Sequence, residues 1–360
     1  MITKPTLILD EEKCRANIRT MYEKALLNKL DFRPHFKTHQ SLEIGRWFKE
    51  LGVDKITVSS IKMANYFAGE WDDITIAFPV NILEIDAINS LAERIGLNLL
   101  IESVESTHFL SEHLEHNIGV FIKVDVGYHR TGVDPNNTDL IDRILDLVEK
   151  SPKLTFKGFL THPGHSYDAR SIDRVLEIHD TSLAIMAELK SRYLAKYPEM
   201  TISIGDTPTC SLAEDFTDID EIRPGNFVFY DLTQVYIGAC ALDKVAVAMV
   251  CPVVAIHRER DELVIYGGGV HFSKDRIEDE SCVTVFGQIV ESSGKAWGKE
   301  IEGMYVKSLS QEHGVISVPR DKISNYTIGD ELVVIPVHSC MTADVTDRYL
   351  TTDAKFIERL

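Results

Sequence analysis

The sequence predicts a (β/α)8 barrel followed by an antiparallel β domain. Up to about residue 235, short runs rich in β-branched residues alternate with longer segments that carry apolar residues at helical spacing. After about residue 240, helical segments give way to short strands separated by turn residues. We therefore expect a barrel domain at 1–240 and a β domain at 241–360. A first strand at Thr6–Leu9 is compatible with either domain, so residues 1–10 could pack with the β domain.

Eight runs are predicted as parallel barrel strands. They are, in chain order, Asp31–Phe36, Ile56–Ser60, Ile74–Phe78, Leu97–Ile101, Val120–Asp125, Phe156–His162, Ile202–Gly205 and Glu221–Arg223. The predicted helices between them are Ser41–Leu51, Ile61–Glu70, Ile82–Ile95, Val104–Leu114, Leu140–Lys150 and Arg170–Tyr197. Strands that alternate with helices must run parallel, because each helix carries the chain back across the sheet.

The β domain is predicted from short β-rich runs and from the turn residues between them. The runs are Val245–Ile256, Glu262–Tyr266, Cys282–Phe286, Met304–Leu309, Gly314–Val318 and Glu331–Pro336. Gly267–Gly269, Asp275 and Gly329–Asp330 supply turn chemistry. Short strands joined by such turns indicate antiparallel pairing.

Composition excludes several classes of partner. The chain has 360 residues, of which 44% are hydrophobic and 26% charged, as in ordinary globular proteins. Its net charge of -18 and pI near 5.2 argue against nucleic acid and anionic membranes as partners. No apolar run approaches the roughly 18 residues that a membrane span needs. The first residues lack an apolar signal core, so we expect a cytoplasmic protein.

Unusual residues follow five of the predicted strands. Lys37 follows the first strand, Arg130 the fifth, and His162 closes the sixth. Gly205–Thr209 follows the seventh and Arg223–Asn226 the eighth. Each alone has an ordinary explanation as a turn former, a solvated side chain or a locally bonded histidine. Because barrel enzymes place their active sites at the C-terminal ends of the strands, the five together predict a functional site.

The last two of these loops suit a phosphate group. Thr207 and Thr209 offer hydroxyl donors, and Asn226 adds an amide. Gly225 lets backbone N–H groups approach a ligand closely. Barrels often bind phosphate with the loops after strands seven and eight. The sequence therefore predicts a phosphate site at this end of the barrel.

A lysine across the barrel mouth from a phosphate site indicates pyridoxal 5'-phosphate (PLP). Partial burial at a strand end is expected to lower the pKa of Lys37, so that its neutral amine can form a Schiff base with an aldehyde. His162 is then placed to stack on the cofactor ring and Arg223 to face the pyridine nitrogen. Because an arginine cannot accept the proton of that nitrogen, the ring stays a weaker electron sink.

His338 and Cys340 form a second candidate site. Residues two apart on an extended segment point to the same side, and an imidazole with a thiolate suits a metal such as zinc. Two protein ligands leave positions open for water and substrate, as a catalytic metal requires. On spacing alone, a buried cysteine beside a surface histidine is the simpler alternative. The remaining cysteines show no disulfide spacing and are expected to be reduced.

These motifs resemble those of the D-serine dehydratase / D-threonine aldolase family, which comprises fold-type III PLP enzymes of the alanine-racemase-like superfamily. The resemblance rests on Arg33–His39, on His162–Tyr167 with Pro163 in place of alanine, on Gly205–Thr209 with Asp206 in place of serine, on Arg223–Asn226, and on Pro336–Cys340. Asp206 puts a carboxylate beside the predicted phosphate loop, which is unfavourable unless its side chain turns away.

The resemblance implies a PLP- and metal-dependent lyase acting on D-3-hydroxy amino acids. The reaction is either dehydration of D-serine to pyruvate and ammonia or cleavage of D-threonine to glycine and acetaldehyde. Lys37 is implied as Schiff-base residue and α-proton base, Arg130 near the phenolic oxygen of the cofactor, and Tyr167 near the ring and substrate. A divalent metal, commonly zinc with manganese or magnesium as alternatives, is implied on His338 and Cys340. The family further implies a homodimer.

Three alternatives stay open on the sequence. An amino acid racemase of the alanine racemase type shares the barrel and the lysine but needs no metal, so the pair His338 and Cys340 argues against it. A non-catalytic PLP-binding protein is typically a single barrel without a second domain. A barrel that binds another phosphorylated ligand would use no lysine chemistry. Between the two lyases, the thiolate at Cys340 favours the dehydratase.

Overall fold

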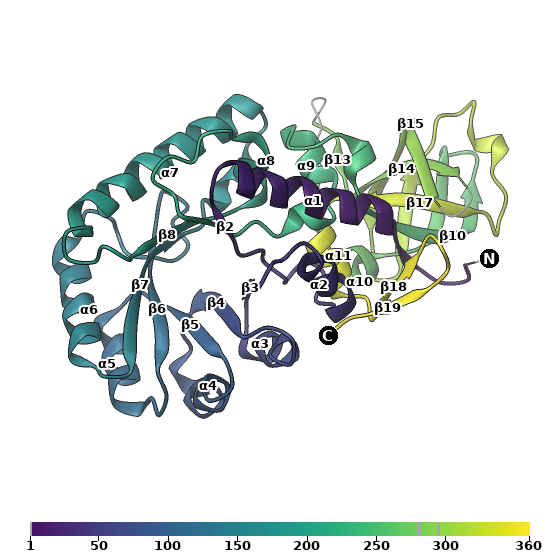
Figure 1. The fold of residues 1–360 in the computed structure, drawn as a ribbon. Coiled ribbons are helices and arrows are strands. Elements are labelled where there is room, and N and C mark those ends of the chain that lie inside the picture. Colours follow the sequence, from purple (N-terminus) through teal and green to yellow (C-terminus); the bar gives the residue numbers. More distant parts are fainter. Residues whose placement is uncertain (1, 279–281, 294–295) are drawn as a thin grey trace. The chain divides into compact units, whose positions relative to one another are not determined.

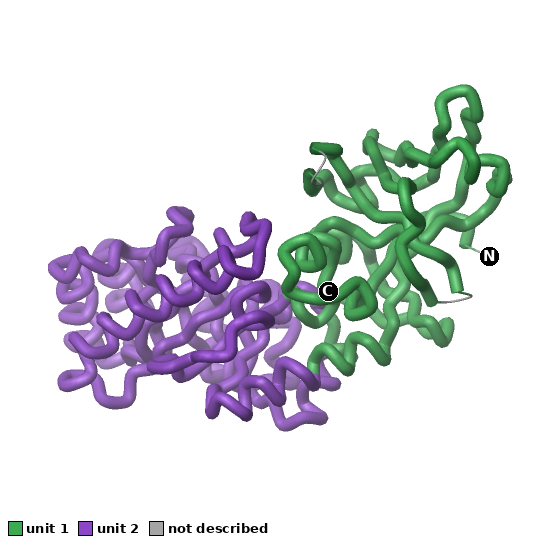
Figure 2. Tube along the Cα trace, turned by 90° about the horizontal axis from the view of Figure 1, so that it is seen from above, with its two compact units in different colours: residues 1–18, 41–44, 226–360 green, residues 19–40, 45–225 purple. Residues whose placement is uncertain are grey.

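The computed structural model describes residues 2–278, 282–293 and 296–360. The chain divides into two compact units (Figure 2). The first, called the barrel unit here, comprises residues 19–40 and 45–225. The second, called the β unit, comprises residues 1–18, 41–44 and 226–360.

An eight-stranded parallel sheet forms the centre of the barrel unit. Its strands in spatial order are β2 (Asp31–Phe32), β9 (Glu221–Ile222), β8 (Thr201–Ile204), β7 (Leu154–Thr161), β6 (Ile118–Val124), β5 (Gly96–Ile101), β4 (Asp73–Pro79) and β3 (Lys55–Val58). All eight predicted strands are confirmed. β2 is shorter than predicted, because Pro34 has no N–H to continue the ladder.

The sheet nearly closes on itself through the segment that follows β2. His35 forms a parallel bridge with Thr57 of β3. The Phe36 N–H donates to the Thr57 carbonyl at 2.8 Å, and the Thr57 N–H donates to the Pro34 carbonyl at 2.9 Å. These bonds join the first and last strands of the sheet, so the predicted (β/α)8 barrel is confirmed.

Helices cover the outer face of this sheet (Figure 1). They include α3 (Ile61–Phe67), α4 (Ile85–Ala92), α5 (Val104–His113), α6 (Thr138–Lys150) and α7 (Ile172–Tyr193). The barrel unit also contains α8 (Thr207–Leu212) and the short helices η1 (Ile82–Glu84) and η2 (Gly164–Asp168). Two further helices, α1 (Glu11–Leu27) and α2 (Leu42–Lys49), contribute residues to both units.

Helix α6 shows why these segments fold as predicted. Its buried residues Ile141, Ile144, Leu145 and Val148 recur at the spacing of one helical face. Asn137 begins the helix, and its side chain accepts a hydrogen bond from the N–H of Leu140. Burial of this apolar face against the sheet stabilises the helix more than intrinsic propensity does.

A nine-stranded sheet forms the β unit. Its order is β11 (Glu262–Tyr266), β16 (His313–Ser317), β15 (Ala296–Leu309), β14 (Gly287–Ser293), β17 (Glu331–Pro336), β10 (Val247–His257), β1 (Thr6–Leu9), β18 (Arg348–Thr351) and β19 (Phe356–Glu358). Strand β11 also pairs with β10, so six of the strands close into a ring. Neighbouring strands run antiparallel except β1 and β18, which are parallel.

The remaining elements of the β unit are short. They are the strand pair β12 (Ile277–Glu278) and β13 (Thr284–Val285), the helices α9 (Leu232–Ile237), α10 (Gly269–Phe272) and α11 (Ser339–Asp344), and the single turns η3 (Asn226–Val228), η4 (Leu242–Lys244) and η5 (Ile323–Asn325). Within the described ranges, no helix is both long enough and apolar enough to cross a membrane.

The six strands predicted after residue 240 are all present. The sequence was compatible with either domain for the strand Thr6–Leu9. In the structure this strand pairs with β10 and belongs to the β unit. Four strands of the described residues were not predicted: β12, β14, β18 and β19. Their sequences mix polar and apolar residues. Pairing with distant strands makes β14 and β18 strands, as of Gly287 with Pro336 and of Leu350 with Ile8.

Candidate functional site

Lys37 lies in a turn directly after the bridge formed by His35. The turn is anchored by Phe36, which is fully buried and packs edge-on against Trp71 with ring centroids 5.2 Å apart. The Lys37 side chain itself is exposed. The prediction of a partly buried lysine at a strand end is therefore wrong, because the strand pairing ends at His35 and the lysine projects from the turn beyond it.

Two half-buried histidines accompany this lysine. Burial lowers the pKa of both His35 and His162, and the charge of Lys37 lowers both further. Nδ1 of His162 lies 2.6 Å from the carbonyl oxygen of Gly205. A carbonyl oxygen only accepts, so Nδ1 carries the hydrogen and Nε2 is the acceptor nitrogen. His162 is therefore a neutral ring in a fixed orientation.

Arg223 is buried at the end of β9 and held by polar groups inside the barrel. Its Nε donates to Ser203 Oγ at 2.7 Å, and its guanidinium also donates to the Thr161 carbonyl. Ser203 Oγ in turn donates to Glu221 Oε1 at 2.6 Å. Burial lowers the pKa of Arg223 to about 10, although the charge of Glu221 opposes this change. The guanidinium remains a cation near neutral pH.

The loop after β8 is organised by Asp206, which is 2% exposed. Its carboxylate begins helix α8 and accepts from the Thr209 N–H at 3.0 Å, from Thr209 Oγ1 at 2.5 Å and from Ser166 Oγ at 2.6 Å. Burial raises its pKa, although these hydrogen bonds oppose the rise. The carboxylate is thus occupied by donors from Thr209 of the same loop and from Ser166.

The same bonds change the expected roles of two predicted residues. Thr209 has a single hydroxyl hydrogen, and that hydrogen goes to Asp206. Asp206 therefore competes with a phosphate for the hydroxyl hydrogen of Thr209. The Thr207 N–H donates to the hydroxyl oxygen of Tyr167 at 3.2 Å, which places Tyr167 beside this loop.

Arg130 lies in the loop after β6, which Asp125 folds into a tight turn. Asp125 Oδ1 accepts from the N–H groups of Gly127, Tyr128 and His129, each at 3.0 Å. The Arg130 guanidinium stacks 4.7 Å from the centre of the Tyr128 ring.

The Tyr128 ring links this loop to the loop after β7. Its centroid lies 6.1 Å from that of His162. Gly164 passes so close to the same ring that a Cβ there would overlap it. The predicted residues Arg130 and His162 are therefore brought to one end of the barrel by a tyrosine that the sequence reasoning did not select.

Lys123 is a further residue that the sequence reasoning missed. It lies on β6 and is 6% exposed, and its Nζ donates to the Val124 carbonyl at 3.2 Å. Burial, together with the charges of Arg223 and Arg130, lowers its pKa to about 7. The available signal was a lysine within the otherwise apolar run Ile118–Val124.

His338 and Cys340 lie where β17 ends and α11 begins. The extended segment predicted for them is wrong, since Ser339 already starts the helix. Nδ1 of His338 lies 2.7 Å from Asp275 Oδ2. Burial alone would lower the pKa of His338, but hydrogen bonds with Asp275 and Cys340 raise it to about 11. The imidazole and the thiol are therefore neighbours, as the spacing predicted.

This pair has the donor set of a two-ligand metal site. With Nδ1 held by a carboxylate, Nε2 is the nitrogen of His338 left for a metal, an arrangement common among metal-binding histidines. No group of three His, Cys, Asp or Glu side chains suited to a metal occurs in the part of the chain that the structure describes. Asp275, predicted only as a turn residue, is thus a neighbour of the pair.

Asn226 is also placed differently from the prediction. Its Nδ2 donates to Asp231 Oδ2 at 2.6 Å and to Ser339 Oγ at 3.1 Å, all within the β unit. A buried carboxylate therefore competes for the amide that was expected to donate to a phosphate. The predicted Gly225 approaches the His35 carbonyl so closely that a Cβ would lie 2.8 Å from that oxygen.

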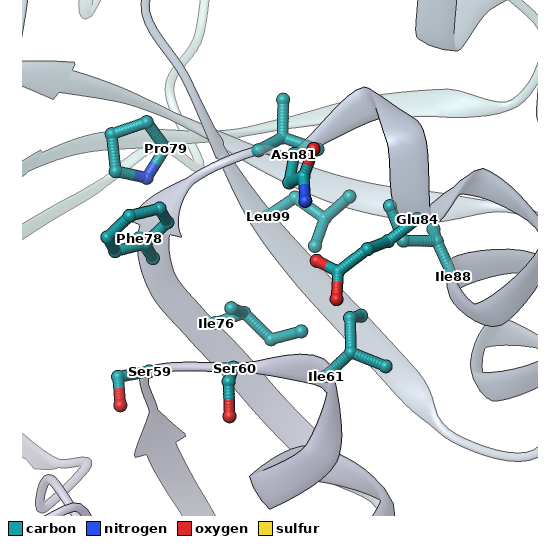
Figure 3. Close-up of a pocket in the computed structure, with 11 residues that line it drawn as sticks. Ser59, Ser60, Ile61, Ile76, Phe78, Pro79, Asn81, Glu84, Ile88 and Leu99 are labelled. Atoms are coloured by element: carbon teal, nitrogen blue, oxygen red, sulfur yellow. The ribbon is translucent and has the colours of Figure 1, made fainter.

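A separate apolar pocket of about 250 Å³ lies at the ends of β3 and β4 (Figure 3). Its polar groups Ser60 and Asn81 begin helices and accept from the N–H groups of Met63 and Leu83. Glu84 is its one charged lining residue. None of the predicted site residues lines this pocket, so it is distinct from the site described above.

Known proteins match this chain over nearly its whole length. Residues 9–232 match the family model of the alanine racemase N-terminal domain, and residues 246–352 match a putative serine dehydratase domain. The chain is 28% identical to a D-serine dehydratase of Dictyostelium discoideum, over 97% of this chain and 93% of that protein. It is 24% identical to a 3-hydroxy-D-aspartate aldolase of Paracoccus denitrificans, over 97% and 88% respectively.

A solved structure gives the same result. D-threo-3-hydroxyaspartate dehydratase from Delftia sp. HT23 matches with a TM-score of 0.90 and 25% identity, over 100% of this chain and 98% of that chain. A cysteine-to-alanine mutant of D-threo-3-hydroxyaspartate dehydratase has been solved in a metal-free form. These matches confirm the fold class and the resemblance that the motifs predicted.

Proposed function

Because the chain belongs to the family of the alanine racemase N-terminal domain, we propose that it is a PLP-dependent lyase acting on D-3-hydroxy amino acids. Its full-length relatives are named as dehydratases and aldolases of such compounds. D-serine dehydration is the favoured reaction. The observation that carries the proposal is the cluster of cationic side chains around Lys37 and His162 in the barrel unit.

The barrel unit fits a cofactor that has both an aldehyde and a phosphate. The Lys37 amine is exposed and can react with the aldehyde. Lys37, Lys123 and Arg130 all lower the pKa of His162, so positive charge gathers there and favours an anion. We assign phosphate binding to Thr207 and to the backbone N–H groups around Gly225.

The residues of this chain then take defined roles. PLP, when bound, withdraws electrons from the substrate Cα. Lys37 Nζ would take the proton from that carbon as the β-hydroxyl group leaves. His162 would stack on the ring, Tyr167 would orient ring and substrate, and Arg130 would bind the phenolic oxygen.

Arg223 is assigned to the pyridine nitrogen. A guanidinium donates hydrogen bonds but cannot accept one, so it would bond to the unprotonated pyridine nitrogen and would not stabilise the protonated form. The ring then withdraws electrons less strongly, which suits a reaction in which the leaving group departs soon after the proton is lost.

His338 Nε2 and Cys340 Sγ would hold a divalent metal. Imidazole with thiolate matches zinc, whereas magnesium and manganese prefer oxygen ligands. The metal would supply Lewis-acid chemistry for the hydroxyl group of the substrate. The thiolate ligand favours dehydration over aldol cleavage. A racemase would not need this pair, which is why the racemase and the non-catalytic PLP-binding protein are the less favoured functions.

The test is an assay of purified, PLP-supplied protein with D-serine and with D-threonine, each with and without a chelator. Keto acid production that the chelator abolishes supports the dehydratase, and glycine with an aldehyde supports the aldolase. Formation of the L-enantiomer, unaffected by the chelator, contradicts the lyase. Cys340→Ala should remove activity and Cys282→Ala, which changes an exposed cysteine, should not.

The proposal extends to location and assembly. None of the six cysteines forms a disulfide in the structure, and proteins of the reducing cytoplasm rarely contain disulfides. We propose that the enzyme acts there as a homodimer. Light scattering of the purified protein measures the assembly, and a monomer with full activity contradicts the dimer.

A further inference from the structure

The segment that carries the metal pair is held on both sides of His338 by the first turn of α9. On one side, Thr233 Oγ1 donates to the Val337 carbonyl at 2.8 Å, and the Thr233 N–H donates to the same oxygen at 3.2 Å. On the other side, the Ser339 N–H donates to Asp231 Oδ2 at 2.9 Å, and Ser339 Oγ lies 3.3 Å from that oxygen. The backbone of His338 is therefore restrained at both neighbours.

Asp231 does more than begin a helix. It is 1% exposed, and its two carboxylate oxygens have different partners. Oδ1 accepts from the Gln234 N–H at 3.1 Å, which is the helix-capping bond of α9. Oδ2 accepts from Ser339 and from the Asn226 amide. Serine, threonine or asparagine caps a helix as well and is less costly to bury, so capping alone does not explain a carboxylate here.

The same network reaches the second ligand. Asn226 Nδ2, which Asp231 holds at 2.6 Å, also lies 3.5 Å from Cys340 Sγ. A hydrogen bond to a ligand sulfur changes how strongly that sulfur binds a metal. A ligand backbone that is already restrained loses less conformational entropy when the metal binds. One buried carboxylate is thus connected to the backbone between the two ligands and to the amide beside the thiol.

We propose that Asp231 is a positioning residue that preorganises His338 and Cys340 for metal binding, with Thr233 as its partner on α9. The inference rests on the proposed function, since it takes the pair to be a metal site. Asp231 touches neither the metal nor the substrate in this role. It acts on the segment Val337–Cys340 through Ser339 and on the thiol through Asn226.

The test measures zinc affinity, independently of activity, in PLP-loaded protein by competition with a chromogenic chelator. Asp231→Asn replaces one carboxylate oxygen by an NH₂ group, which cannot accept from Ser339 and Asn226. The substitution should weaken zinc binding roughly 10- to 100-fold, the range seen when hydrogen-bond partners of metal ligands are changed. Thr233→Val removes one hydroxyl and should give a smaller loss. Asp10→Asn is the matched control, because Asp10 accepts from the Lys13 N–H at the start of α1 in the same unit.

A second readout separates positioning from stability. The visible spectrum of Co²⁺-substituted protein reports the geometry of the ligands, and it should change in Asp231→Asn but not in Asp10→Asn. Folded Asp231→Asn and Thr233→Val proteins with wild-type zinc affinity and an unchanged cobalt spectrum would overturn the positioning role alone. If His338→Ala binds zinc as tightly as wild type does, His338 is not a metal ligand. That result would overturn the metal site itself, and with it both proposals. If Asp231→Asn does not fold, Thr233→Val decides between these results.

Discussion

Arg223 Nε lies 2.7 Å from Ser203 Oγ inside the barrel, and this bond orients the guanidinium. Ser203→Ala should leave the buried Nε without its partner, which destabilises a protein by about 1–3 kcal/mol. It should also weaken PLP binding, because Arg223 can then turn. Denaturant unfolding and a PLP titration measure the two effects. Ser203→Thr, which keeps the hydroxyl, is the control, and wild-type behaviour of Ser203→Ala contradicts the orienting role.

Asp275 is expected to determine which nitrogen of His338 binds a metal. Asp275→Ala should lower zinc affinity roughly 10- to 100-fold, since Nδ1 of His338 loses its acceptor at 2.7 Å. Asp275→Asn should have a smaller effect, because an amide oxygen still accepts. Calorimetric titration with zinc measures both variants. Equal zinc affinities for Asp275→Ala and Asp275→Asn would show that the hydrogen bond to His338 Nδ1 does not contribute to zinc binding.

Asp206 should make stability fall as pH rises above the acid range. Burial raises its pKa in the folded state above the unfolded value of about 4. Between these two pKa values the folded state holds the proton more tightly, so the free energy of unfolding decreases as pH increases through this window. Asp206→Ser keeps a helix-capping oxygen and removes the carboxylate. Urea unfolding from about pH 4 upward should show a smaller decrease in the variant than in wild type, and an equal decrease contradicts the assignment.

Arg33 should be a main stabilising residue of the barrel unit. It is 5% exposed and binds Glu221 at 2.7 Å and Asp73 at 2.6 Å. Arg33→Leu leaves the buried Glu221 without its cation, which should reduce the free energy of unfolding by about 3–5 kcal/mol. Denaturant unfolding measures the loss. Arg46→Leu, which breaks an exposed pair with Glu70, is the control and should change stability by less than about 1 kcal/mol.

Much of the fold was predictable from local patterns. Apolar spacing and the alternation of strands with helices identified the barrel, because these patterns report which face of each segment is buried. The loops that follow the strands were predictable for the same reason, since parallel strands bring their C-terminal ends to one edge. Lys37, Arg130, His162 and Arg223 were selected in this way.

Hydrogen-bond partners far apart in the chain were not predictable. Asp206 takes the Thr209 hydroxyl and also binds Ser166, 40 residues away. Asp275 binds His338, 63 residues away, and was expected only to form a turn. No periodicity reports such pairs, because they depend on how separate elements pack. Strands such as β14 were missed for the same reason, since their pairing with distant strands outweighs a weak local pattern.

The sequence by itself determined the architecture, the candidate Schiff-base lysine and the two candidate metal ligands, because each depends on residue type and local spacing. The tertiary structure decided which polar groups are available for a ligand. It exposed Lys37 in a turn, committed the Thr209 hydroxyl to Asp206 and the Asn226 amide to Asp231, and buried Lys123. Burial and competing hydrogen-bond partners decide these outcomes, and both arise only when distant segments pack together.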